Sequence, residues 1–317
     1  MIDITLLGCS ALLPLPDRAL TAAALKCCGR TILFDCGEGT QTAARRAGVS
    51  LMNADLIALT HYHGDHILGL PGLLQTMFSM NRDRPLMITG PEGLEEAMEP
   101  ILRLAGYLSF SLRLMAWPKA GAALSELFPG WPDRAVLSAF PTNHRVPSQG
   151  YRFSLGRAGK FLPDQARALG VPVGLWDRLQ RGESVALGET VIRPEQVMER
   201  ERRGLSFVFS GDTAPCASLT DAARDADLLI CEATYGENDQ AELARSYGHM
   251  TFAQAGETAA RAGARRLWLA HYSQRIEHPA EYLPNAQAYF PGAVCGEDGL
   301  GLTLRFDEED ASGVPRS

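Results

Sequence analysis

The residues His61-Tyr62-His63-Gly64-Asp65-His66 place three imidazoles and a carboxylate within six positions. They follow Leu56-Ile57-Ala58-Leu59-Thr60, an apolar run typical of a short buried strand. Side chains at positions i and i+2 of an extended segment point to the same side, so His61 and His63 can converge. Gly64 then allows the tight turn that returns Asp65 and His66 to the same region.

This motif indicates a metal site. Neutral imidazole and carboxylate are ligands that zinc and similar divalent metals accept. Four such residues exceed what one catalytic metal with an open coordination position needs, so two metals sharing the site is the favoured interpretation. A histidine-rich surface turn is the alternative, and the density of ligand-type residues argues against it.

Three further ligand-type residues follow runs that are typical of strands. They are His144 after residues 135–140, Asp212 after residues 207–211, and His271 after residues 267–270. Ligand sites in α/β folds gather at the carboxyl ends of strands, where the loops converge. Each residue alone would more often have a core or surface role. Together they predict one site assembled from four strand ends.

Composition sets the limits. The chain has 317 residues, 46% hydrophobic and 21% charged, as expected for a soluble globular protein. No apolar run approaches the roughly 20 residues that span a membrane, and no signal peptide opens the chain. Seven cysteines without a spaced pair favour reduced thiols, so we expect a cytoplasmic protein.

The net charge of −7 is not the basic balance of many nucleic-acid-binding proteins. Residues 157–203 are an exception, with nine Arg or Lys against seven Asp or Glu. The segment 156–203 is also rich in Gly and Pro and lacks a sustained core period. It is predicted to be an inserted, projecting and mobile substrate arm. A solvated face of mixed charge is the alternative interpretation of its composition.

Strands and helices are expected to alternate along the chain. Thr251-Phe252-Ala253-Gln254 is a capping box that opens a helix ended by Gly263. The tail, residues 307–317, is predicted to be disordered. The expected strands are 2–7, 22–27, 31–34, 86–89, 151–154, 205–209, 228–231 and 267–270, and the expected helices are 41–47, 68–80 and 91–104.

The order of these motifs resembles the metallo-β-lactamase superfamily and, within it, the ribonuclease Z family. The matching phrases are Phe34-Asp35-Cys36-Gly37-Glu38-Gly39-Thr40-Gln41, Gly64-Asp65-His66-Ile67-Leu68-Gly69-Leu70-Pro71-Gly72-Leu73-Leu74, Val146-Pro147-Ser148-Gln149-Gly150-Tyr151-Arg152-Phe153 and Ser210-Gly211-Asp212-Thr213. The resemblance implies an α/β fold, a four-layer αββα sandwich of two mixed sheets. It also implies a single domain over residues 1–306 with the arm inserted at about 156–203.

The same resemblance implies a zinc-dependent endoribonuclease that cleaves the 3′ trailer from tRNA precursors. It further implies that the protein is a cytoplasmic homodimer. Each chain would hold two Zn²⁺, although Mn²⁺ or another divalent metal could replace zinc. One metal would be held by His61, His63 and His144, the second by Asp65, His66 and His271, with Asp212 between them. Asp65 would also act as base toward the attacking water, and His249 would donate a proton to the leaving oxygen.

Other residues near these motifs have two interpretations. His249 precedes a helix, which suits proton transfer better than metal ligation, and a helix-flanking surface histidine is the alternative. Glu232 and Asp35 lie at strand ends, where they could orient ligand imidazoles. Arg275 could meet a phosphate or form an ordinary surface ion pair.

Two departures from the family pattern support a second hypothesis. Leu175 stands where the tip proline of the arm is expected, and the first loop, residues 8–18, lacks the usual Pro-Thr and Arg-Asn elements. With the acidic net charge, these favour another hydrolase of the same fold that acts on small phosphodiesters or esters. A non-catalytic RNA-binding module is a third hypothesis, and it leaves the complete ligand set unexplained.

Overall fold

The computed structural model describes residues 1–118, 120–188 and 190–306. Residues 307–317, predicted to be disordered, lie outside this range. Contacts divide the chain into two compact units. The first contains Met1–Leu155 and Leu205–Arg305, and the described part of the second contains Gly156–Gly204 and Phe306.

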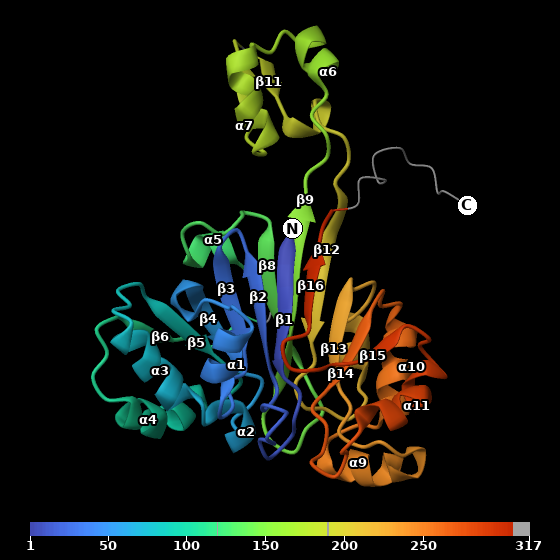
Figure 1. The fold of residues 1–317 in the computed structure, drawn as a ribbon. Coiled ribbons are helices and arrows are strands. Elements are labelled where there is room, and N and C mark those ends of the chain that lie inside the picture. The colour runs from blue at the N-terminus through green and yellow to red at the C-terminus, as the bar shows by residue number, and fades with distance from the viewer. Residues whose placement is uncertain (119, 189, 307–317) are drawn as a thin grey trace. The chain divides into compact units, whose positions relative to one another are not determined.

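The first unit is built on two seven-stranded mixed sheets (Figure 1). In sheet order, the first has β16 (Gly301–Leu304), β1 (Ile2–Gly8), β2 (Ala22–Cys27), β3 (Arg30–Phe34), β4 (Ala54–Ala58), β5 (Leu86–Thr89) and β6 (Leu112–Leu114). The second has β15 (Ala293–Cys295), β14 (Leu267–Ala270), β13 (Leu228–Glu232), β12 (Arg202–Phe209), β9 (Gln149–Arg157), β8 (Ala135–Pro141) and β7 (Ala122–Ala123). Strands β3 to β6 are parallel, as are β12 to β15.

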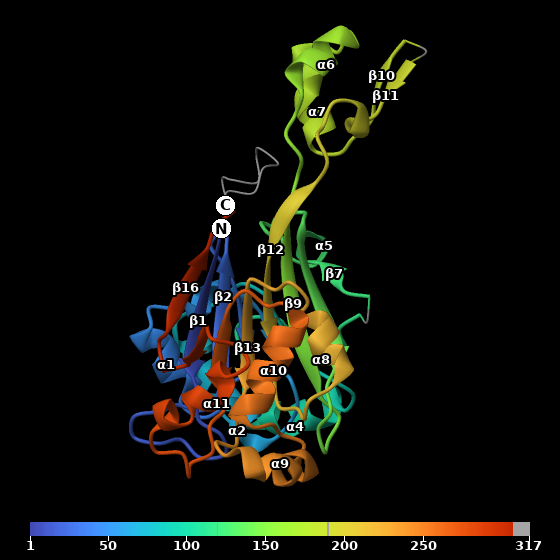
Figure 2. The ribbon, with the colours of Figure 1, turned by 90° about the vertical axis from the view of Figure 1, so that its right-hand side faces the viewer.

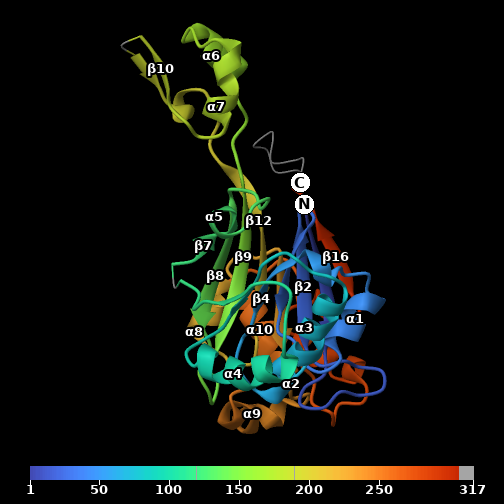
Figure 3. The same ribbon diagram turned by 90° about the vertical axis from the view of Figure 1, so that its left-hand side faces the viewer.

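Helices cover the outer faces of both sheets. In Figures 1 and 3, α1, α3 and α4 lie outside the first sheet, and in Figure 2 α10 and α11 lie outside the second. The helices of this unit are α1 (Thr40–Arg46), α2 (Gly64–Ile67), α3 (Leu70–Ser79), α4 (Leu94–Ala105), α5 (Leu124–Leu127), α8 (Ala217–Ala222), α9 (Ala241–Tyr247), α10 (Phe252–Ala262) and α11 (Leu283–Gln287). The predicted αββα sandwich is therefore confirmed.

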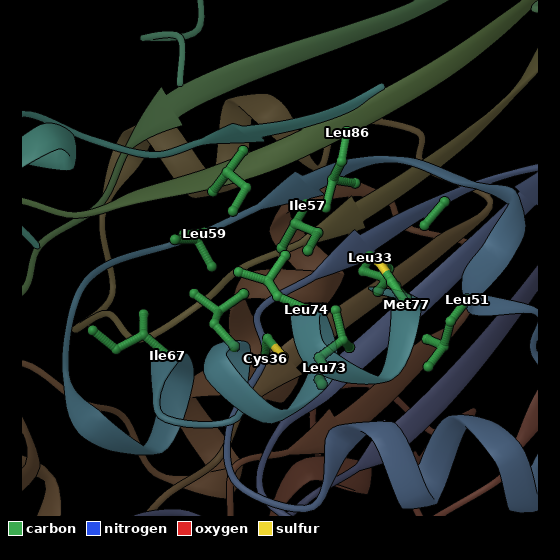
Figure 4. Close-up of a cluster of buried hydrophobic side chains, with 14 of the residues drawn as sticks. Leu33, Cys36, Leu51, Ile57, Leu59, Ile67, Leu73, Leu74, Met77 and Leu86 are labelled. Atoms are coloured by element: carbon green, nitrogen blue, oxygen red, sulfur yellow. The ribbon is translucent and has the colours of Figure 1, made fainter. Parts of the chain in front are cut away.

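Two apolar layers hold these elements together. Between the helices and the first sheet, Leu33 and Ile57 pack with Leu73, Leu74 and Met77 of α3 (Figure 4). Aromatic rings from two other strands pack around Phe34 of β3 between the sheets. The ring centroids of Tyr151 on β9, and of Phe207 and Phe209 on β12, lie 5.4–5.8 Å from the centroid of Phe34. A strand covered on both faces is buried along its length. Every residue of β4 is buried, including Asp55.

The structure corrects two predicted boundaries around the histidine motif. The strand expected to reach Thr60 ends at Ala58, because the Thr60 N–H donates to the Asp35 carboxylate (2.7 Å). The helix expected from Leu68 begins at Leu70, after the separate short helix α2. At the break, a Cβ on Gly69 would lie 2.0 Å from the Gly37 carbonyl oxygen, so the two segments touch through backbone.

The capping box is confirmed. The Gln254 N–H donates to Thr251 Oγ1 at 3.3 Å, and the Thr251 N–H donates to Gln254 Oε1 at 3.0 Å. Helix α10 ends at Ala262, and Gly263 takes the left-handed conformation with φ +65°. None of the helices in the described ranges is long and apolar enough to cross a membrane.

The second unit has a small core of its own. It contains α6 (Pro163–Ala168), α7 (Trp176–Gln180) and a hairpin of β10 (Val185–Leu187) and β11 (Thr190–Ile192). The buried side chains that pack together are Ala166, Val171, Leu179, Val185, Ile192 and Val197. Because each short element contributes only one or two of them, the sequence shows no sustained period.

A matched pair of substitutions tests the outer apolar layer. Leu73 is fully buried, whereas Leu104 on α4 is 74% exposed. We expect Leu73→Ala to lower the free energy of unfolding by about 2–5 kcal/mol, because it removes buried methyl groups and leaves a cavity. Leu104→Ala should change it by less than about 0.5 kcal/mol. Urea unfolding followed by circular dichroism measures both, and equal shifts would contradict this placement of the core.

Candidate metal centre

The structure brings all eight predicted site residues together: seven follow the carboxyl ends of β4, β8, β12 and β14, and His249 lies in the loop before α10. One group of ligand-type side chains contains His61, His63, His144 and Asp212, and a second contains Asp65, His66 and His271. A third group contains Asp212 and His271 again, with His249. Within each group the candidate ligand atoms lie within 4.8 Å of one another. Each group could therefore hold a metal ion.

Short distances between ring nitrogens define the two main groups. His61 Nε2 lies 2.9 Å from His63 Nδ1, and His144 Nε2 lies 3.4 Å from the same atom. In the other group, His66 Nε2 and His271 Nε2 are 3.3 Å apart. Asp65 Oδ2 lies 3.5 Å from each of these two nitrogens.

Asp212 lies between the groups. Its Oδ2 is 3.6 Å from His61 Nε2, while its Oδ1 is 3.4 Å from His66 Nε2 and 3.2 Å from His271 Nε2. The carboxylate is 3% exposed. One side chain is thus within reach of ligands from both groups.

Hydrogen bonds on the opposite ring nitrogens fix four of the imidazoles. In each case Nδ1 has a polar partner: Thr60 Oγ1 for His61 (3.1 Å), Asp35 Oδ2 for His66 (2.8 Å), the Gly248 carbonyl oxygen for His144 (2.9 Å) and Thr234 Oγ1 for His271 (2.9 Å). This arrangement leaves Nε2 facing the centre, as is usual for metal-binding histidines. His63 differs, because its Nδ1 faces inward.

The strand ends leading into the site adopt a left-handed backbone conformation. Asp35 has φ +59°, and His271 has φ +60°. Gly211 also has a positive φ, and a Cβ there would lie 2.6 Å from the Thr60 Cβ. Such conformations are costly for residues other than glycine and persist only where surrounding contacts hold them. Here they aim side chains from the strand ends into one centre.

The electrostatics of the site separate neutral imidazoles from ionised carboxylates. Burial lowers the pKa of His61, and the neighbouring His66 lowers it further. Burial and His144 likewise lower the pKa of His63. Burial alone would raise the pKa of Asp212, but His271 and His66 hold it well below its usual range. Neutral imidazoles beside an ionised carboxylate form a donor set that suits a divalent metal.

His66 is the exception among the imidazoles. Burial by itself would lower its pKa, but the Asp212 and Asp35 carboxylates raise it well above the usual value. A proton on this ring would offset part of the negative charge of the two carboxylates. A divalent cation would provide the same compensation and displace that proton.

An unpaired oxygen provides the test of metal fit. Asp212 Oδ1 is buried and has no hydrogen-bond partner, which is costly for a carboxylate unless a cation lies near it. The nearby Nε2 atoms of His66 and His271 also face one another across 3.3 Å. The oxygen and the two ring nitrogens converge on one region, so these residues fit a metal that displaces the His66 proton.

His249 is held by a different carboxylate. Its Nδ1 donates to Glu232 Oε1 at 3.0 Å. Burial alone lowers the pKa of His249, but Glu232 and then Asp212 raise the pKa to about 9. Glu232 was expected to orient a ligand imidazole, and it reaches His271 only through Thr234, whose hydroxyl donates to Glu232 Oε2 at 2.8 Å.

The remaining predictions have mixed outcomes. Asp35 holds His66 directly, as expected. Arg275 is not among the residues that line the cavity next to this site. The orienting hydroxyls of Thr60 and Thr234 were missed, although each lies within two residues of a predicted site residue or strand-end carboxylate. Leu12 was also missed: its N–H donates to Asp65 Oδ2 at 2.9 Å, and it has φ +63°.

The site opens into a cavity of about 560 Å³. Its walls combine the metal-type side chains with residues from neighbouring loops and from the end of α9. They include Leu12, His63, Asp65, His144, Arg145, Asp212, Tyr235, Tyr247, His249 and His271. The volume is within the range of pockets that bind small molecules.

Comparisons with known proteins agree with this architecture. Residues 3–105 match the family described as "Anti-Pycsar protein Apyc1", and residues 195–272 match the "Beta-lactamase superfamily domain". The short form of human tRNase Z, a solved structure, superimposes with a TM-score of 0.66 at 27% identity and covers 96% of this chain and 100% of that one. A metallo-β-lactamase fold protein, YhfI from Bacillus subtilis, has a TM-score of 0.67 at 19% identity and covers 95% of this chain and 98% of its own, which shows the fold alone.

Curated relatives resemble the chain along its whole length. Ribonuclease Z of Lachnoclostridium phytofermentans is 38% identical over 312 residues, which is 98% of this chain and 100% of the relative. Ribonuclease Z of Lachnospira eligens is 38% identical over 309 residues, again with 98% and 100% covered. The matched length therefore spans nearly the whole chain. The chain belongs to the ribonuclease Z family.

Proposed function

We propose that the chain is a zinc-dependent endoribonuclease that removes the 3′ trailer from tRNA precursors, by attack of an activated water on a phosphodiester. The observation that carries the proposal is the shared Asp212, which lies between two imidazole groups and next to His249. Family membership supports the substrate class, because the relatives are named ribonuclease Z and tRNase Z.

The ligand-type residues divide into two sets. His61, His63 and His144 would hold one metal, Asp65, His66 and His271 the other, and Asp212 would contact both. Metals bound there would lower the pKa of a water and stabilise the attacking and leaving oxygens of an in-line displacement. The prevalence of imidazole favours zinc, with Mn²⁺ or another divalent metal as a substitute.

Two side chains would move protons. Asp65 is ionised, since hydrogen bonds from His271 and His66 outweigh burial and hold its pKa far below the usual value. It can accept a proton from the attacking water. Glu232 and Asp212 raise the pKa of His249 to about 9, so the ring would be protonated at neutral pH. Because Glu232 occupies its Nδ1, the proton on Nε2 is the one available to the leaving oxygen.

The second unit would serve as the substrate arm inserted, at about residues 156–203, in a single metallo-β-lactamase-fold domain over residues 1–306. Several of its arginines are neutralised locally: Arg178 pairs with Glu183 and Arg181 with Asp177. Recognition would therefore combine exposed backbone and apolar contacts with phosphate contacts. Val173 lies in the short turn before α7 and is 70% exposed. It is therefore the residue at the tip of the arm that we expect to contact the tRNA.

Cellular context and assembly complete the proposal. The protein would be cytoplasmic, supported by seven free cysteines, of which Cys9, Cys27, Cys36 and Cys231 are buried. It would form a homodimer, as its resemblance to the family implies. Analytical ultracentrifugation measures that state, and a monomer at micromolar concentration would contradict it.

A second function is supported by one observation. The cavity of about 560 Å³ can hold a small phosphodiester, and such a substrate would need no arm. Bis(p-nitrophenyl) phosphate cannot separate the two functions, because either enzyme would cleave it. Cleavage of an unprocessed tRNA at the discriminator base separates them. Turnover of the small diester without cleavage of the precursor would favour the second function.

Metal content tests the ligand assignment. Asp212→Ala should abolish hydrolysis and reduce bound zinc, because it removes the carboxylate placed between the two sets. His63→Ala should weaken metal binding by the set that also contains His61 and His144. His278→Ala, which alters the one histidine outside the predicted site, is the matched control and should keep both metal and rate. Mass spectrometry measures zinc per chain; full activity without bound metal would contradict a metal-dependent reaction.

His249→Ala tests the proton donor. The variant should retain metal but lose about 10²–10⁴-fold in phosphodiesterase rate. The loss should be smaller for nitrophenolate, a good leaving group that needs little protonation. Equal losses for good and poor leaving groups would indicate a positioning role.

The dependence of the cleavage rate on pH is a second test of His249 as the proton donor. A protonated His249 is present below its pKa of about 9 and is lost as pH rises through that value. The wild-type rate on poor leaving groups should therefore fall at alkaline pH. Glu232→Gln removes the charge that raises this pKa, so the fall should begin at lower pH.

Val173→Glu tests the arm. A carboxylate at the tip should repel tRNA phosphates and raise KM for precursor tRNA several-fold, while turnover of small diesters is unchanged. A point change is preferable to deletion, since Val171 is buried in the unit's core and accepts a hydrogen bond from Trp176. Val191→Glu, at a 55% exposed position on β11, is the matched control. Equal KM changes in both variants would mean that the tip is not the recognition surface.

A further inference from the structure

Arg145 and Tyr247 face each other on the wall of the central cavity. The guanidinium carbon of Arg145 lies 5.5 Å from the centroid of the Tyr247 ring. Both side chains are exposed and line the cavity of about 560 Å³. Neither is among the ligand-type residues, so the proposed chemistry leaves this pair without a role.

The pair is anchored to two site histidines. Arg145 follows His144 directly, and Tyr247 precedes Gly248-His249. The Gly248 carbonyl oxygen accepts a hydrogen bond from His144 Nδ1 at 2.9 Å. Gly248 has φ +75°, and a Cβ there would lie 2.8 Å from the same nitrogen and 3.0 Å from the His144 Cα. This close approach fixes the two segments against each other.

The imidazole rings on these two segments are also close to each other. The ring centroids of His144 and His249 are 5.1 Å apart. Each segment therefore contributes one imidazole to the centre and one larger side chain to the wall. The Arg145–Tyr247 pair therefore lies on the two segments that carry His144 and His249.

Charge points to the kind of group that this wall would contact. Among the residues that line the cavity, Arg145 is the only arginine or lysine, and Asp65 and Asp212 carry the opposite charge. Within residues 1–118, 120–188 and 190–306, no ion pair joins Arg145 to a carboxylate. A guanidinium lying over an aromatic ring keeps N–H donors for phosphate oxygens. The exposed Tyr247 ring can stack on a base.

We propose that Tyr247 and Arg145 bind the nucleotide that carries the leaving oxygen, with Tyr247 stacked on its base and Arg145 in contact with an adjacent phosphate. Tyr247 lies two residues before His249, the group that would protonate this oxygen, and both residues line the same cavity. The proposal therefore assigns the Tyr247 ring to the leaving-group side of the scissile bond. The inference rests on the proposed nuclease function and names substrate-binding residues for it.

A comparison of two enzymes on two substrates tests the stacking. Wild-type protein and Tyr247→Ala are assayed on precursor tRNA, and on the same RNA with an abasic residue at the nucleotide carrying the leaving oxygen. Tyr247→Ala should lower kcat/KM on the intact RNA by about 5–150-fold, the effect of one base–aromatic stack. It should have no effect on the abasic RNA, which wild type already cleaves slowly. Tyr247→Phe should restore the intact-RNA rate.

Arg145→Ala tests the phosphate contact separately. It should weaken cleavage of both RNAs equally and reduce the slope of log kcat/KM against log salt by about one. Arg113→Ala on β6 and Tyr107→Ala, at a 78% exposed position, are matched surface controls and should leave both RNAs unaffected. An unchanged slope in Arg145→Ala would overturn the phosphate assignment.

Failure of this inference is distinct from failure of the proposed function. Equal loss on intact and abasic RNA in Tyr247→Ala, or an unchanged rate on intact RNA, would overturn the stacking while wild type still cleaves tRNA. If wild type cleaves neither RNA, the nuclease function fails and the pair is tested by binding. An oligoribonucleotide carrying 2-aminopurine should then be quenched by wild type and not by Tyr247→Ala. Equal quenching by both proteins would overturn the pair as a base-binding site.

Discussion

The buried carboxylate of Asp212 is the constraint on which the rest of the site depends. One of its oxygens has no hydrogen-bond partner, and imidazole nitrogens of three histidines lie 3.2–3.6 Å from the carboxylate. A carboxylate placed in the interior without compensation is strongly unfavourable. The surrounding structure holds nitrogen and oxygen donors around this carboxylate, in an arrangement that suits a cation. Ligand-type atoms from the ends of β4, β8 and β14 lie within 4.8 Å of this carboxylate.

Close backbone approaches provide that aim. A Cβ on Gly37 would lie 2.1 Å from the Asp65 carbonyl oxygen, and one on Gly211 would lie 2.6 Å from the Thr60 Cβ. These contacts bring loops from separate strands together without side chains between them. Asp35 adds a polar connection, since its two oxygens accept from Thr60 and hold His66. Fold and site are therefore stabilised by the same small set of contacts around β3, β4 and β12.

The sequence was informative where a residue's role depends on its own strand. His144, Asp212 and His271 each follow an apolar run, and ligand-type residues in α/β folds gather where the carboxyl ends of strands meet, so their convergence could be predicted. It was less informative where roles depend on distant partners. Glu232 holds His249 rather than a ligand imidazole, because the loop before α10 returns to the end of β13. Leu12 bonds Asp65 across 53 positions, and no local pattern signals such a contact. The core of the second unit escaped detection because its apolar residues are spread over short elements.

X-ray absorption spectroscopy of the zinc-loaded protein measures the central claim directly. Two metals that share Asp212 should give a metal–metal scattering distance of about 3.5–4 Å, with nitrogen and oxygen neighbours at about 2.0–2.2 Å. In Asp212→Ala, the metal–metal signal should disappear. A single zinc with no metal–metal scattering in the wild type, at full metal loading, would contradict the assignment of two sets of ligands around one carboxylate.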